Sequence, residues 1–281
     1  MKNRTITRNV TYSRNEQIIE SDCDSLCAQK IKYYHLDDIS RELGAFHTIV
    51  MSDFDEKLKS EQLSEFSQSE IIQFIQNEMR AYQFHKIKIS DTDIDNVSKF
   101  CNEQFTEEVQ KFTNSGFDLT GLSSTFIGDE NFYNKLNIIQ FQNYCNEIDE
   151  NFLSFLTIST SHNDLSRRYF KFIDEELKEF MNKKVENDYL LARIFADVYL
   201  SSFNFLVIHY DNANTKGKLW ESIKQTVKDA WQVAKPIVVS DAGGAAIGAM
   251  AGSLAGGPGI VAGGMAGACT SSLGTAVDVY M

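Results

Sequence analysis

Apolar residues recur at every third or fourth position through most of the first 210 residues, which is the spacing of an amphipathic helix. The clearest stripe is Ile39, Leu43, Phe46, Val50 and Phe54. Similar stripes cover residues 71–82, 94–112, 132–155, 165–180 and 190–208. The chain has no proline before Pro236, so no proline interrupts helices in this stretch. The pattern predicts an all-α protein with an irregular multi-helix body.

Three segments depart from this pattern or leave it ambiguous. Residues 115–128 contain three glycines and three serines, and we expect them to be the main loop of the body. Residues 203–208 fit a short buried strand as well as a helix. We favour a helix there, because no partner strand is evident. Residues 4–12 alternate between apolar and polar and fit either an isolated strand or an extended segment.

The composition changes near the C-terminus and divides the chain into four parts. Residues 1–211 form the predicted soluble acidic body, and residues 212–217 form a polar linker. Residues 218–235 form a basic amphipathic helix, and residues 236–281 form a glycine-rich helical hairpin. Residues 1–217, the body and the linker, carry the whole net charge of −12. An acidic body of this kind has no electrostatic attraction for the phosphates of nucleic acid, so we expect no nucleic-acid partner.

The basic helix carries both tryptophans of the chain. Trp220 and Trp231 fall on its apolar face, and Lys224 and Lys228 point away from that face. Basic helices with tryptophan on the apolar side favour the membrane interface. These four residues are therefore candidate interface anchors. The alternative is that the same apolar face packs on the body.

The hairpin region is defined by its glycines, since 11 of the chain's 16 lie between Gly243 and Gly274. They recur every fourth residue in two runs, which are Gly244, Gly248, Gly252 and Gly256, then Gly259, Gly263 and Gly267. Residues four apart share one face of a helix, so each run makes a groove without side chains. We expect these two grooves to form the seam between two helices, as small residues do in membranes.

Residues 242–277 contain no charged side chain. Residues 236–257 and 258–281 are each long enough to cross a hydrocarbon core of about 30 Å at about 1.5 Å per residue. Gly257 and Pro258 are turn-forming residues and mark the expected hairpin turn. Asp241, near the end of the first span, adds a cost to insertion. The helical hairpin is therefore only marginally stable in water and in lipid. We expect it to be stored against the body or against a partner protein.

These glycines carry a resemblance to a known family. The spacing from Gly244 to Gly267 resembles the glycine-zipper segments of class II two-peptide bacteriocins and related bacterial membrane-active proteins. The resemblance covers about 45 C-terminal residues and leaves the body unassigned. It implies a lipid bilayer as partner and helix pairing during membrane permeabilisation. We also expect an immunity or chaperone protein that covers the hairpin, or homo-oligomers formed through the glycine faces.

Motifs of catalysis and metal binding are missing from the sequence. It contains no phosphate-binding loop, no HExxH and no GxSxG. The five cysteines are odd in number and widely spread, and the spacing of Cys23 and Cys27 is not that of a zinc site. We therefore expect no enzyme, no cofactor, no metal and no catalytic residue. An active site assembled from residues far apart in the sequence is the remaining alternative.

The N-terminus has basic residues but no apolar run after them, so it does not read as a secretory signal peptide. We expect synthesis in the cytoplasm and action at a membrane, with export by a signal-independent route as one option. The favoured function is a non-enzymatic, bacteriocin-like toxin or effector whose hairpin perturbs a bilayer. The alternatives are a membrane-anchored adaptor, an intracellular effector with a sensing body, and a soluble helical protein with a buried hairpin.

Overall fold

A computed structural model describes residues 25–61, 67–97, 99–182, 186–214 and 220–280. Within these ranges the secondary structure consists of α-helices and two short 3₁₀ helices, without a strand. The predicted all-α class is therefore confirmed. The expected extended segment at residues 4–12, and Cys23, lie outside the described residues.

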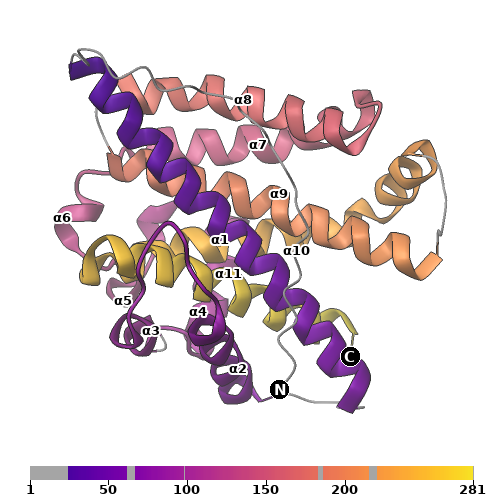
Figure 1. The fold of residues 1–281 in the computed structure, drawn as a ribbon, viewed down its shortest axis with the longest axis horizontal. Coiled ribbons are helices and arrows are strands. Elements are labelled where there is room, and N and C mark those ends of the chain that lie inside the picture. Colours follow the sequence, from indigo (N-terminus) through magenta and orange to yellow (C-terminus); the bar gives the residue numbers. More distant parts are fainter. Residues whose placement is uncertain (1–24, 62–66, 98, 183–185, 215–219, 281) are drawn as a thin grey trace.

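The helices follow one another with short connections (Figure 1). The first half contains α1 (Ser25–Glu61), α2 (Gln68–Ala81), α3 (Asp91–Val97), α4 (Glu103–Asn114), η1 (Leu119–Gly121), α5 (Ser124–Ile127) and α6 (Glu130–Tyr133). The second half contains α7 (Ile138–Ile158), α8 (His162–Asn182), α9 (Glu186–Asn214), α10 (Trp220–Gly252), η2 (Ser253–Ala255) and α11 (Gly256–Tyr280).

Two of the predicted helices are divided in the structure. The stripe over residues 94–112 belongs to α3 and α4, and the stripe over residues 132–155 belongs to α6 and α7. At each break an asparagine caps the next helix: Asn102 accepts a hydrogen bond from the Gln104 amide, and Asn137 accepts one from the Gln140 amide. Asparagine competes for backbone hydrogen bonds and favours caps, a local effect that apolar periodicity does not reveal. Residues 203–208 lie within α9, as we favoured.

The centre of the bundle is formed by α10 and α11. We call residues 236–280 of α10, η2 and α11 the C-terminal hairpin. Its two arms pack along each other, and α1 and α9 cover them on one side. Figure 1 shows α1 crossing in front of α9 and α11, with α7 and α8 beyond α9 and with α2 to α4 along the opposite flank of the hairpin. The hairpin is therefore the core around which the body is arranged.

The first half of α10 also belongs to this packing. Helix α10 runs without a break through Pro236, so the predicted boundary between residues 235 and 236 is not a helix end. Trp231 is buried and stacks on Phe152 of α7, with ring centroids 5.6 Å apart.

Helix α9 continues to Asn214, three residues beyond the expected end of the body at residue 211. The rest of the predicted linker, residues 215–217, lies outside the described residues.

Candidate functional site

The seam of the hairpin is a contact between the backbones of its two helices. A Cβ atom placed on Gly248 would lie 2.1 Å from the carbonyl oxygen of Gly263, and one placed on Gly263 would lie 2.1 Å from the oxygen of Gly248. Gly252 and Gly259 face each other in the same way, as do Gly244 and Gly267. Real Cβ atoms do not approach other atoms this closely, so the seam accepts glycine only.

The turn of the hairpin lies earlier in the chain than predicted. The first arm ends at Gly252, and the chain reverses through η2 to Gly256, which has φ +75°. Gly257 and Pro258, which we expected at the turn, lie in the first turn of α11, where the missing proline amide costs no helix hydrogen bond. Gly256 faces open space instead of the seam. The seam therefore holds six of the seven predicted glycines.

The body encloses most of the hairpin. Trp231–Gly274 contains the one candidate membrane span that length and composition identify among the described residues, and 78% of its most apolar window is buried. A core helix of a soluble protein passes the same test. Among residues 242–274 of the uncharged segment, residues 254–257 at the turn are exposed, Pro258 and Gly274 are half-buried, and the rest are buried.

The candidate interface anchors have unequal positions. Trp231 is in the core, and Lys224 is buried, with its ammonium donating to the carbonyl oxygens of Thr157 at 3.2 Å and Ser159 at 2.9 Å. These carbonyls lie at the C-terminal end of α7, where the helix dipole favours a positive charge. Lys228 is half-buried, and the side chain of Trp220 lies outside the described residues. In this structure Trp231 and Lys224 follow the packing alternative. The prediction that Lys224 points away from the apolar face is wrong, because residues seven apart lie on the same side of a helix. Contact with lipid stays a prediction for an inserted state.

A cluster of four buried polar side chains joins the hairpin to the body. We call His47 of α1, Ser202 of α9, Asp241 of α10 and Ser272 of α11 the central polar cluster. His47 Nε2 lies 2.7 Å from Ser272 Oγ and 3.5 Å from Asp241 Oδ2, and Ser202 donates to Asp241. Ser272 Oγ also lies 3.0 Å from the Ala268 carbonyl oxygen, and when its hydroxyl donates there, Nε2 of His47 is the donor to Ser272. The cluster therefore ties both arms to α1 and α9.

The same residue types form hydrolytic triads, but this arrangement does not support that chemistry. A catalytic histidine receives its carboxylate at one ring nitrogen and its serine at the other. Here both partners lie at Nε2 of His47, and Nδ1 has no hydrogen-bond partner. His47 and Ser272 are fully buried, so a substrate has no access to them. The sequence does not reveal the cluster, because its members come from four helices. A lone Asp241 beside an uncharged segment was the only signal.

A second buried ionic group belongs to the body. The guanidinium of Arg193 in α9 is fully buried and faces three carboxylates, of Asp197 at 3.2 Å, Asp174 at 3.1 Å and Asp37 at 3.5 Å. Burial raises the pKa of Asp37, while Arg193 and the Tyr189 hydroxyl oppose that shift. These contacts join α1, α8 and α9. The three carboxylates compensate the buried charge of Arg193, so removal of a partner would leave a buried charge uncompensated.

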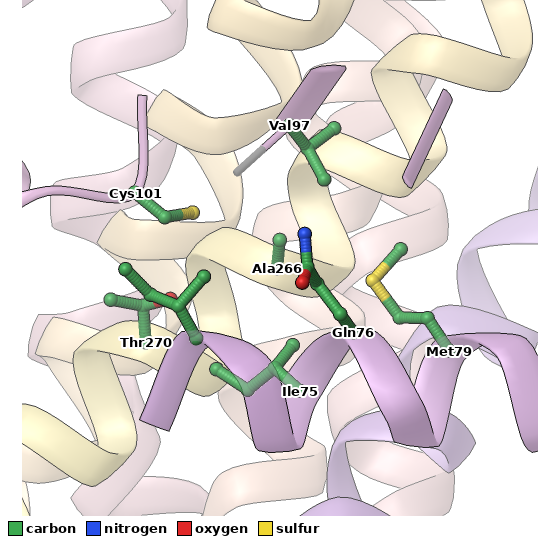
Figure 2. A pocket seen from close by; sticks show the side chains of 8 residues that line it. Ile75, Gln76, Met79, Val97, Cys101, Ala266 and Thr270 are labelled. Carbon is green, nitrogen blue, oxygen red and sulfur yellow. The ribbon is translucent and has the colours of Figure 1, made fainter. Parts of the chain in front are cut away.

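A small pocket between α2, α3 and α11 offers no room for a substrate (Figure 2). Most of its lining is apolar, with Gln76, Cys101 and Thr270 as its polar members. It holds about one water molecule, far less than the several hundred Å³ of a usual ligand site. Within the part of the chain that the structure describes, no three histidine, cysteine, aspartate or glutamate side chains gather in a group that could hold a metal ion.

The buried thiols report on whether the hairpin is packed in the body. Burial raises the pKa of Cys101 to about 12, and Cys269 of α11 is fully buried. In a variant with Cys23→Ser and Cys27→Ser, we expect Ellman's reagent at pH 8 to leave Cys101, Cys145 and Cys269 unmodified. Guanidinium should expose all three. Rapid modification of the native protein would contradict the packing described here, because a protonated buried thiol is not a nucleophile.

Comparisons with known proteins add nothing to this description. No protein-family model, no curated protein and no solved structure matches the chain.

Proposed function

We propose that this chain is a non-enzymatic membrane-active protein, a toxin or effector, that holds its hairpin in the core of a helical body and inserts it into a bilayer. The observation that carries the proposal is a seam of glycine pairs within a stretch, residues 242–277, that has no charged side chain. The glycine spacing is also the basis of the resemblance to bacteriocin segments.

The glycine seam suits lipid as well as it suits a protein core. Each helix satisfies its own backbone hydrogen bonds, which is required in hydrocarbon. The glycine pairs contact through their backbones, and such packing does not depend on the hydrophobic effect. The two arms can therefore leave the body as a paired unit, and their side chains can exchange protein contacts for lipid contacts.

Leaving the body has a cost that a trigger or a membrane must supply. The hairpin packs on α1, α4 and α9, and the central polar cluster would be broken when it leaves. Asp241 would then need water or headgroups, which it can reach because it lies near the base of the hairpin. The closed structure is thus a storage form in this proposal.

One alternative has an observation in its favour. A soluble protein could use the glycine seam to pack a tight central hairpin, and the 78% burial of the apolar window fits that function. This alternative requires no insertion. It does not explain why the stretch at residues 242–277 lacks charge even at its exposed turn.

Vesicles distinguish these functions. We expect the full-length protein to pellet with phosphatidylcholine vesicles and to release an entrapped dye, with protein denatured before addition as a control for non-specific leakage. Pelleting without dye release would favour an anchored adaptor. A protein that neither pellets nor releases dye, at any pH between 4 and 8, would refute the proposal and favour the soluble alternative.

A further inference from the structure

Between residues 242 and 274, the exposed residues of the uncharged segment lie at the turn of the hairpin. Residues 254–257, which we call the tip, are all exposed. Leu254 is 75% exposed, the largest value among the large hydrophobic side chains whose burial the structure describes. An isolated exposed leucine is ordinary, but this one is continuous with a buried apolar hairpin.

The two ends of the hairpin are attached to the body in different ways. At the tip, Ser253 accepts a hydrogen bond from the amide of Asp129 at 2.8 Å, and the backbone of Gly128 packs on that of Met250. At the base, the central polar cluster joins Asp241 and Ser272 to α1 and α9. The tip is therefore apolar and held by few polar contacts, whereas the base is polar and held by several.

The acidic residues beside the tip determine which lipid surface would repel it. Asp129 and Glu130 follow Gly128 directly, and the whole chain carries a net charge of −12. Anionic headgroups would repel these groups, with a range of about 8–10 Å at physiological salt. An uncharged tip beside acidic residues is complementary to a neutral lipid surface.

We propose that the tip is the membrane-docking surface of this protein, that its partner is a neutral phospholipid bilayer, and that the hairpin enters tip first. This inference rests on the proposed function and adds its partner and its direction. Leu254 partitions into the headgroup boundary first. The base is released afterwards, because the polar cluster keeps it in the body until the arms begin to move.

Substitutions at the tip test the docking step. Leu254→Asp places a charge on an exposed side chain, so the fold should be unchanged, and we expect at least a tenfold loss of affinity for phosphatidylcholine vesicles. Leu254→Trp should raise that affinity, since tryptophan favours the interface. The matched control is Val233→Asp, which is also exposed on α10 but lies 21 residues before Leu254, about 30 Å along the helix. It should bind within twofold of the wild type.

The outcomes separate this inference from the proposed function. If the wild type binds vesicles and Leu254→Asp binds equally well, the tip proposal fails while membrane activity stands. If phosphatidylglycerol strengthens binding, the neutral-surface assignment is wrong. If the wild type binds neither lipid, both proposals fail together. Circular dichroism and a melting curve on each variant establish that the fold is intact before the comparison is made.

Discussion

Gly248→Ala should lower the free energy of unfolding by about 3 kcal/mol, the upper part of the range for overpacking a tight core. The added Cβ would lie 2.1 Å from the carbonyl oxygen of Gly263, and that atom is backbone and cannot turn aside. The helices would have to separate by more than about 1 Å to reach ordinary contact. Because the hairpin is the centre of the bundle, that separation would also displace the helices packed around it.

The measurement is a thermal melt followed by circular dichroism, in which about 3 kcal/mol corresponds to about 6 °C for a domain of this size. The matched control is Gly257→Ala in the same hairpin, where an added Cβ meets no atom within 4 Å. Alanine favours helix over glycine by up to about 1 kcal/mol, so this control should be silent or slightly stabilising. Equal melting temperatures for the two variants would contradict the seam.

The spacing of the glycines predicted the seam because close helix approach depends on a local property, the repeat of small residues on one face. The prediction that Gly256 lies in the seam was wrong, because the first arm ends at Gly252 and Gly256 lies in the turn. A dipeptide of turn-forming residues does not fix the residue at which a helix ends. Gly257 and Pro258 continue into α11 for the same reason.

Contacts between helices depend on which helix packs against which, and the periodicity of apolar residues does not carry that information. The apolar face of residues 218–235 was visible in the sequence, but the contact of Trp231 with Phe152 arises from the arrangement of α7 beside α10. The pairing of His47 with Ser272 joins residues 225 positions apart. The sequence alone offers no route to such a contact.

The proposed function requires the hairpin to leave the body, and a reversible crosslink tests that requirement. A Cβ on Gly243 of α10 would lie 2.8 Å from the Cγ2 of Thr113 in α4. The two Cβ atoms are thus on the order of 4 Å apart, the separation that a disulfide requires. Thr113→Cys also removes the methyl group that the new side chain would meet. The pair Thr113→Cys and Gly243→Cys should therefore join the hairpin to the body without distortion.

The measurement is dye release from phosphatidylcholine vesicles by this double variant, in a background of Cys23→Ser and Cys27→Ser, before and after reduction. Mass spectrometry establishes that the crosslink is complete, and each single cysteine variant, with and without reductant, controls for the substitutions. We expect the oxidised protein to release almost no dye and the reduced protein to release it at the rate of the uncrosslinked background. Equal release by the oxidised and reduced forms would contradict the account, because the hairpin would then act without leaving α4.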